Sequence, residues 1–247
     1  MLGLRSSLLS SGVPTDNLLN LTTKLALWLQ HNTATPAQWN DSSGNENHAT
    51  QSSALLQGAL VEGGLDFEET DAGDNIHETH YDLTNMITVA AEQGFCIAWV
   101  MKQETQTNNT LISDTSHETI RIQNANKIRL LTNAPGDIES IYHASSGPFT
   151  SGAKALFMLN RTSGGSSVVT LYKNGSAVTL DASSGNSTLA DAGENNNGFS
   201  FDTIGAANSG TNHFFDGILY ELAFWTKELS ATEIADVNSY LKTKHAL

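Results

Sequence analysis

Short apolar runs, many of them alternating with polar residues and each bounded by Gly, Asn, Asp or Ser, recur along this chain from residue 25 onward. Runs of this kind are typical of β-strands joined by turns. The runs that we expect to form strands cover residues 25–31, 64–68, 95–103, 119–124, 127–132, 155–160, 168–173, 201–204 and 217–225. Because no long helical pattern separates them, the sequence predicts an all-β sandwich or barrel.

Two hairpins are marked by the residues at their turns. Residues 120–130 alternate on both sides of Asn124-Ala-Asn126, and the pair Asn174-Gly175 interrupts a second alternating run. An Asn-Gly pair is favoured where both central residues of a two-residue turn need a positive φ. We therefore expect tight antiparallel hairpins at both places.

One helix is expected, over residues 230–244. It begins with Ser230-Ala-Thr-Glu233, which fits a capping box, because the serine oxygen and the glutamate carboxylate can each accept from a backbone N–H of the first turn. Apolar residues follow at helical spacing, namely Ile234, Val237, Tyr240 and Leu241. This spacing predicts that one face of the helix packs against the strands.

The charge and the cysteine content exclude several classes of protein. Lys plus Arg total 12 and Asp plus Glu total 26, which gives a formal net charge of −14. We expect no nucleic-acid partner, because negative charge opposes a phosphate backbone. No apolar run approaches the roughly 18 residues of a membrane-spanning helix, and the single cysteine, Cys96, cannot form an internal disulfide. The first residues lack the apolar core and cleavage site of a secretory signal, so export by a signal peptide is not expected.

Three separated stretches carry a family pattern. They are Trp39-Asn-Asp41-Ser-Ser-Gly44-Asn45-Glu-Asn47, then Gly64-Leu-Asp-Phe67, and finally Phe215-Asp-Gly-Ile-Leu-Tyr-Glu221-Leu-Ala-Phe-Trp225, which continues into the expected helix. In order and spacing they resemble the concanavalin A-like jelly roll of the laminin-G type over residues 25–247. The resemblance implies one antiparallel β-sandwich domain, a laminin-G-like jelly roll, with one C-terminal helix at about 230–244.

The opening Met1-Leu-Gly-Leu4, together with residues 25–30, resembles proteins of tailed, particularly marine, bacteriophages that join a short arm to this jelly roll. That resemblance implies a virion structural protein assembled in the host cytoplasm. Decoration of the capsid is the first expectation, and a fibre or tail appendage is the second. Its partners would be other virion proteins and further copies of the chain. The arm, residues 1–24, would provide the anchor through Leu2, Leu4, Leu8 and Leu9.

Enzymatic activity is the least favoured expectation. Related folds include glycoside hydrolases that carry two carboxylates on one strand in the pattern E-x-D-x-x-E. The nearest match is Glu69-Thr-Asp71-Ala-Gly-Asp74, which ends in Asp and lacks the apolar residues that would hold both carboxylates on a strand. A charge run normally faces water. We therefore name no catalytic residue and expect a non-enzymatic protein, with polysaccharide hydrolysis as the last alternative.

Calcium is the only cofactor that the sequence suggests, and we expect none to be required. Residues 62–82 contain eight carboxylates and no Lys or Arg, and a hard cation such as Ca²⁺ would reduce their mutual repulsion. Asp71 and Asp74 are the candidate ligands in that stretch. The family resemblance implies a second calcium site. Its residues are Asp41, Asn45, Asn47 and Glu221. The alternative is that the Asp41 loop only hydrogen-bonds its own backbone, as Asx turns do.

A soluble carbohydrate-binding module is the main rival function, with cell-surface glycans as partners. Sugar rings stack on exposed aromatic side chains, with Asn or Asp nearby to bond their hydroxyl groups. Trp39 is the first candidate for a glycan contact, because it follows a Pro-containing loop and precedes Asn40-Asp41. Tyr142 is the second candidate. The alternative for Trp39 is that it closes one end of the sandwich.

Overall fold

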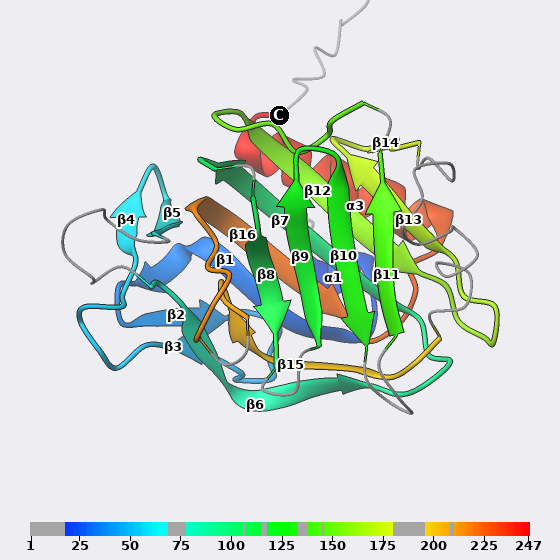
Figure 1. The fold of residues 1–247 in the computed structure, drawn as a ribbon. Coiled ribbons are helices and arrows are strands. Elements are labelled where there is room, and N and C mark those ends of the chain that lie inside the picture. The colour runs from blue at the N-terminus through cyan, green and yellow to red at the C-terminus, as the bar shows by residue number, and fades with distance from the viewer. Residues whose placement is uncertain are drawn as a thin grey trace, which may run out of the picture.

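The computed structural model describes residues 18–68, 78–105, 107–114, 118–132, 138–144, 146–179, 196–207 and 210–247. Within these ranges the chain forms antiparallel strands with a helix near each end (Figure 1). The strands are β1 (Leu25–Thr35), β2 (Gln38–Asp41), β3 (Ala49–Thr50), β4 (Ala59–Val61), β5 (Gly64–Phe67), β6 (Tyr81–Val89), β7 (Phe95–Gln103), β8 (Asn109–Ser113), β9 (Thr119–Asn124), β10 (Lys127–Thr132), β11 (Ile138–His143), β12 (Lys154–Arg161), β13 (Val169–Lys173), β14 (Ser176–Ala177), β15 (Phe199–Ile204) and β16 (Gly217–Trp225). The helices are α1 (Leu18–Leu21) and α3 (Ala231–His245).

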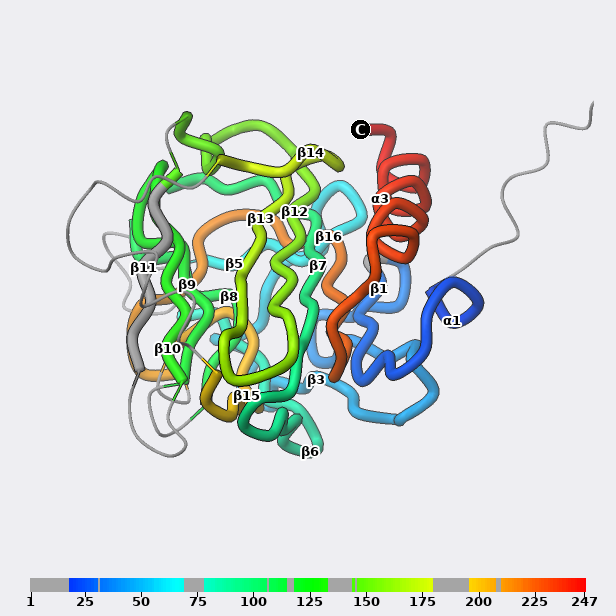
Figure 2. Tube along the Cα trace, turned by 90° about the vertical axis from the view of Figure 1, so that its right-hand side faces the viewer, coloured from blue at the N-terminus to red at the C-terminus, as the bar shows by residue number. Residues whose placement is uncertain are grey.

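The strands are arranged as a sandwich with the C-terminal helix on its outside. Their hydrogen-bonded order is β11-β10-β9-β8-β15-β6-β3-β2-β1-β16-β7-β12-β13-β14, and β5 pairs with β16 and β4 beside this path. The sheet folds over, so that β8–β11 form a front layer opposite a back layer of β16, β7, β12 and β13 (Figures 1 and 2). Helix α3 covers the outer side of the back layer (Figure 2). The antiparallel sandwich with a C-terminal helix that the sequence predicts is confirmed.

The central strands of the back layer are buried on both faces. On β7, Phe95, Ile97 and Trp99 face the front layer and belong to the main apolar core. Between them, Cys96 and Ala98 face the helix and belong to a second apolar cluster. A strand covered on both sides has no need of outward-facing polar residues. This explains why β7 and β16 are continuous apolar runs rather than alternating ones.

The segment just before β1 is part of the folded domain. Leu18 of α1 is fully buried in the cluster beneath α3. The hydroxyl of Thr22 accepts a hydrogen bond of 2.6 Å from Nε1 of Trp225. Residues 18–24, which the sequence pattern placed in the arm, are therefore packed on the domain. The rest of the expected arm, residues 1–17 with Leu2, Leu4, Leu8 and Leu9, lies outside the described residues.

Helix α3 begins as the sequence predicts. Ser230 is the N-cap residue, and both halves of the capping box are present. The Ser230 hydroxyl accepts from the backbone N–H of Glu233 at 3.3 Å, and the Glu233 carboxylate accepts from the backbone N–H of Ser230 at 2.9 Å. Neither α1 nor α3, the helices of the described ranges, has the length and apolar character needed to cross a membrane.

Strands with a regular pattern were predicted well, and irregular ones were missed. The bounds of β7, β9, β10 and β16 agree with expectation, and the expected turn is confirmed by φ values of 49° at Asn174 and 86° at Gly175. Strand β6 was missed because polar Asn85 stands where the alternation needs an apolar residue and apolar Met86 stands at an exposed position. Strands β2, β3 and β4 were missed because two to four residues are too few to show a period.

The capping box gives a first prediction. Replacing Ser230 by Ala removes the oxygen that accepts from the Glu233 N–H, and we expect the free energy of unfolding to fall by about 1 kcal/mol. The free energy of unfolding is measured by urea denaturation. Thr232→Ala is the matched control, since Thr232 is exposed in the same turn and caps nothing, and it should change stability by less than about 0.5 kcal/mol. Equal effects of the two substitutions would show that the cap contributes nothing.

Candidate functional site

The loop after β2 is held by the carboxylate of Asp41. Its Oδ1 accepts from the backbone N–H groups of Trp28 at 2.9 Å and Ser43 at 2.8 Å. Its Oδ2 accepts from the Ser43 hydroxyl at 2.7 Å and from the backbone N–H of Asn47 at 3.1 Å. Both carboxylate oxygens are therefore engaged by the loop itself and by β1. The arrangement is the self-bonded turn that the sequence analysis kept as the alternative to a calcium site.

Two asparagines tie this loop to the neighbouring strands. The side-chain amide of Asn47 accepts from the Asn85 N–H at 2.7 Å and donates to the Asn85 carbonyl at 2.9 Å. The Nδ2 group of Asn45 donates to the carbonyls of Leu25 and Ala26 at 3.0 and 3.1 Å. The loop is thus fixed against β6 on one side and β1 on the other. Asn45 and Asn47 act here as backbone clamps.

A hollow of about 460 Å³, which we call the loop-end pocket, opens beside these clamps. Its lining residues are Lys24, Leu25, Ala26, Asn45, Asn47, Asn85, Ile87, Thr88 and Thr226. The polar groups among them are amides, hydroxyls and one ammonium. The lining contains no carboxylate and no imidazole. Such a pocket can exchange hydrogen bonds with a neutral polar ligand, but it offers no pair of groups for acid and base catalysis.

Glu221 does not join this loop as a cation ligand. It is 1 % exposed on β16, and its carboxylate accepts from Nε1 of Trp28 at 2.6 Å, from Lys244 at 2.8 Å and from His245 at 2.7 Å. Burial alone would raise the pKa of Glu221, but the hydrogen bonds from His245 and Lys244 and the positive charge of Lys244 lower it below its ordinary value. The negative charge is therefore balanced by a lysine of α3.

The four residues of the expected calcium site thus have separate structural roles. The carboxylate oxygens of Asp41 and Glu221 already accept hydrogen bonds from protein groups, and calcium binding at these residues stays a prediction. In the described ranges, no group of three His, Cys, Asp or Glu side chains is arranged to hold a metal ion. The other two candidate ligands, Asp71 and Asp74, lie outside the described residues.

The two aromatic candidates for glycan contact are not placed as expected. Trp39 is fully buried in the main core, and its Nε1 donates to the carbonyl of Gln30. The expectation that Trp39 stacks on a sugar is therefore wrong, because its side chain packs in the main core. Tyr142 lies on β11 opposite Ile128 rather than in a loop. Its side chain is outside the described part of the structure, so its role stays a prediction.

An acidic cluster exists that the sequence spacing did not show. Asp66 on β5 belongs to the acidic stretch 62–82, but its closest electrostatic neighbours include Glu104 and Asp216 from distant parts of the chain. Burial raises the pKa of Asp66, and the negative charges of Glu104 and Asp216 raise it further. Only the pairing of β16 with β5 and β7 brings these residues together.

A second and larger hollow, of about 840 Å³, lies between α3 and the β13–β14 hairpin. We call it the helix–hairpin groove. The hairpin contributes Tyr172, Asn174, Gly175 and Ser176, and the helical side contributes Ala231, Ile234, Ala235, Asn238, Ser239, Lys242, Thr243, Ala246 and Leu247. The sequence analysis named no site here. The available signal was the row of small residues at every fourth position of the helix, namely Ala231, Ala235, Ser239 and Thr243.

Comparisons with known proteins agree with the geometry of the fold. Residues 75–235 match the profile of the concanavalin A-like lectin/glucanases superfamily. Similar solved structures include Trypanosoma rangeli sialidase, with 15 % identity and a TM-score of 0.54 over 90 % of this chain and 33 % of that chain. The receptor-binding domain of botulinum neurotoxin type G has 13 % identity and a TM-score of 0.53 over 89 % of this chain and 52 % of that chain.

A structure of botulinum neurotoxin type C has 14 % identity and a TM-score of 0.55 over 91 % of this chain and 53 % of that chain. This chain therefore spans between a third and about half of the length of these structures. At such low identities the likeness shows the fold alone. A comparison with curated protein sequences finds no match.

The buried Glu221 carboxylate gives a second prediction. Glu221→Ala removes the acceptor of the Trp28 indole and the negative charge that balances Lys244, which keeps its neutral acceptor on Gln30. We expect the free energy of unfolding to fall by about 3 kcal/mol in urea denaturation at neutral pH. The direction in which this contribution to stability changes with pH follows from the lowered pKa of Glu221. Because folding lowers the pKa of Glu221 below its ordinary 4.5, its contribution is complete above pH 4.5 and is lost as the pH falls towards the folded-state pKa.

The control for this prediction is Asp236→Ala, which removes an exposed carboxylate of the same helix. That variant should unfold like the wild type and keep its acid sensitivity. Glu221→Gln should lose much of the stability and show a smaller decline below pH 4.5. An unchanged decline in Glu221→Gln would show that another group governs acid unfolding.

Proposed function

This chain belongs to the concanavalin A-like lectin/glucanase superfamily, and we propose that it is a non-catalytic glycan-binding domain whose binding site is the loop-end pocket. The supporting observation is the chemistry of that pocket. Amide and hydroxyl groups from the Asp41 loop, β6 and the end of β16 converge on one hollow of about 460 Å³. Sugars present closely spaced hydroxyl groups that both donate and accept, and amides and hydroxyls match them without a net charge.

The pocket is also held rigid before any ligand arrives. Asn47 fixes the backbone of Asn85, and Asn45 fixes the start of β1. The side chains of Asn85 and Thr88 remain exposed on the wall of the pocket, while the buried Ile87 and Leu25 supply apolar surface. A preformed site loses little conformational entropy on binding. This arrangement suits a small ligand held by several modest hydrogen bonds.

Binding without hydrolysis is supported by the residues that line the pocket. Glycoside hydrolysis needs two carboxyl groups on either side of the scissile bond, and the lining contains none. Among the similar structures, botulinum neurotoxin type C depends on interaction with two ganglioside molecules to enter cells. The ganglioside is a ligand of the neurotoxin, not of this chain. Because the two share a fold, glycans are the first class of ligand to test here.

Asn85→Ala is the third prediction. The substitution removes only an exposed side chain, because the clamp from Asn47 holds backbone atoms of Asn85. We expect a glycan array to identify a saccharide ligand of the wild-type chain. Calorimetry should then show affinity about tenfold lower in Asn85→Ala, with an unchanged melting temperature.

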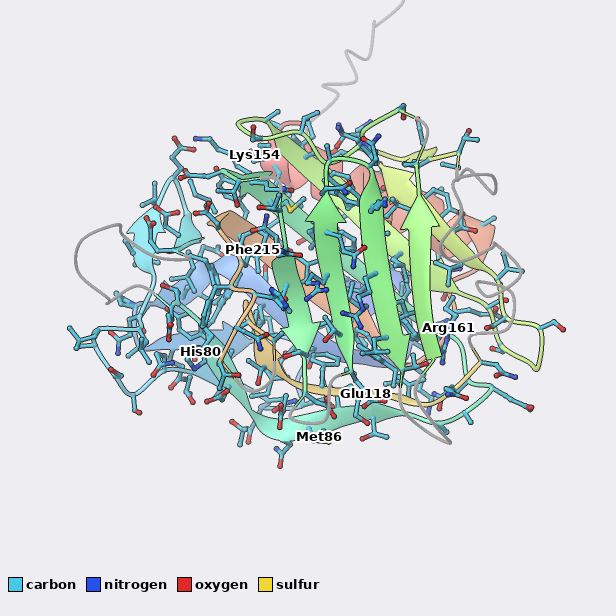
Figure 3. The ribbon with its side chains drawn as sticks, in the orientation of Figure 1. His80, Met86, Glu118, Lys154, Arg161 and Phe215 are labelled. Carbon is cyan, nitrogen blue, oxygen red and sulfur yellow. The ribbon has the colours of Figure 1, made fainter. Side chains whose placement is uncertain are left out.

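Met86→Ala is the control for Asn85→Ala. Met86 is exposed on the same strand, points away from the body of the domain and is not part of the pocket lining (Figure 3). Its removal should leave the affinity unchanged. The proposal fails if the wild type binds no saccharide, or if Asn85→Ala and Met86→Ala bind equally well.

A role in a bacteriophage particle is the second candidate, favoured by the resemblance of Met1-Leu-Gly-Leu4 and residues 25–30 to phage proteins. In that setting the glycan-binding domain would be displayed on the capsid or on a fibre, and residues 1–17 would anchor it. This proposal is compatible with glycan binding, because the pocket and the arm are different parts of the chain.

Two truncations test the anchor as the fourth prediction. Deletion of residues 1–17 should leave the melting temperature unchanged and abolish incorporation into particles, measured by mass spectrometry of purified virions. Deletion of residues 1–24 should in addition destabilise the domain by about 2 kcal/mol or more, because it removes the buried Leu18 and the Thr22 hydroxyl that binds Trp225. Normal incorporation of the shorter truncation would exclude an anchoring role.

A further inference from the structure

One wall of the helix–hairpin groove is formed by small side chains of α3, and the other is formed by the turn of the β13–β14 hairpin. Along α3, Ala231, Ala235 and Ser239 stand one turn apart, so the helix surface is shallow there. Opposite them, the hairpin turn is fixed in place. The Asn174 side chain accepts from the Leu156 N–H at 2.9 Å, and the Asn174 carbonyl accepts from Lys242 at 3.2 Å. The groove is therefore defined by contacts on both sides.

Asn238 places an unused hydrogen-bond acceptor at the floor of this groove. The residue is 5 % exposed, and its Nδ2 donates to the carbonyl of Ile234 at 2.9 Å. This bond fixes the orientation of the amide, because the reverse orientation would set Oδ1 against a carbonyl oxygen. The Oδ1 atom is buried and has no hydrogen-bond partner. A buried acceptor without a donor is uncommon in a folded protein and calls for an explanation.

Gly175 leaves space over this acceptor. A side chain at Gly175 would place its Cβ 3.9 Å from Oδ1 and 3.8 Å from Cγ of Asn238. Together with Cβ of Asn238 at 3.8 Å, those are the nearest contacts that such a Cβ would make. The missing side chain therefore leaves space between the turn and the Asn238 side chain. A ligand that wedges between the turn and the helix can bring a donor there.

We propose that the helix–hairpin groove binds a saccharide that carries an acetamido group, with the amide N–H donating to Oδ1 of Asn238. Because Nδ2 is held by its bond to Ile234, the unpaired atom of the Asn238 amide is Oδ1, which can only accept, and an amide N–H can donate to it. The acetamido methyl packs on the small residues of α3, such as Ala235. The hydroxyl groups of Ser239 and Thr243 lie on the same wall and are available to the sugar ring.

This inference is independent of the loop-end pocket, which shares no residue with the groove. The two hollows differ in the ligand they select. The loop-end pocket offers groups that both donate and accept. The floor of the groove instead offers the Oδ1 acceptor of Asn238 close to the small side chain of Ala235. An acetamido group can donate its N–H there and also pack its methyl group, whereas a hydroxyl group at the same position of a sugar can donate but has no methyl group to pack.

The fifth prediction compares two ligands that differ only in that group, tri-N-acetylchitotriose and cellotriose. Each is titrated into the full chain, labelled with ¹⁵N, and followed by NMR. We expect tri-N-acetylchitotriose to shift the Gly175 backbone N–H and the Asn238 side-chain amide. Cellotriose should bind at least about tenfold more weakly at these groups.

Two variants and one control test the same contact by calorimetry. Asn238→Leu should weaken tri-N-acetylchitotriose binding about tenfold or more while the melting temperature stays equal or rises, because an unpaired buried carbonyl is removed. Ser239→Trp should block the groove without touching Asn238. Asp236→Trp, an exposed position outside the groove lining, should bind like the wild type.

The outcomes separate this inference from the proposed function. Shifts at Asn85 and Thr88 with none at Gly175 and Asn238 would support the loop-end pocket and overturn the groove. Equal binding of the two trisaccharides at Gly175 and Asn238 would overturn the acetamido assignment. Unchanged affinity in Ser239→Trp, or no shift at Gly175 and Asn238 with either ligand, would also overturn the proposal.

Discussion

The carboxylate of Glu221 is the point on which the three layers of the domain depend. Strand β16 has a bulge between Leu219 and Glu221, where its register with β7 shifts by one residue. The bulge interrupts the alternation, so that Leu219 and Leu222 face the front layer while Tyr220 and Glu221 both face the helix. Without this extra residue, Glu221 would be directed into the apolar core, where its charge would have no partner.

Once Glu221 faces the helix, its partners position the rest of the structure. Lys244 and His245 fix the end of α3, and the Ser230 cap fixes its beginning, so the helix cannot slide along the back layer. Trp28 extends the network, because its indole donates to Glu221 while its backbone N–H donates to Asp41. The helix–hairpin groove and the Asp41 loop are therefore connected through one residue of β1.

This network also explains what could and could not be predicted from the sequence. The family pattern grouped Asp41 with Glu221, but a linear pattern cannot show that Trp28 bonds to both carboxylates, through its backbone N–H and its indole. Likewise Trp39 carries the polar neighbours of a surface residue, and only the pairing of β2 with β1 and β3 reveals that it is buried. Strands β7 and β16 and the capped helix were predictable because their pattern is local. The two hollows were not, because each is formed by segments distant in sequence.

The packing of the fold does not explain the presence of Asn238. Its neighbours Ile234, Val237 and Leu241 form the buried face of α3, and a leucine among them would extend the apolar cluster. The amide instead leaves one acceptor unpaired, at a cost of about 1–3 kcal/mol. Its bond to the Ile234 carbonyl offsets little of this, because a carbonyl inside a helix already accepts from the backbone. A destabilising polar group at the floor of a groove, beside a glycine whose missing side chain leaves space next to it, is the pattern expected of a binding residue rather than of a packing residue.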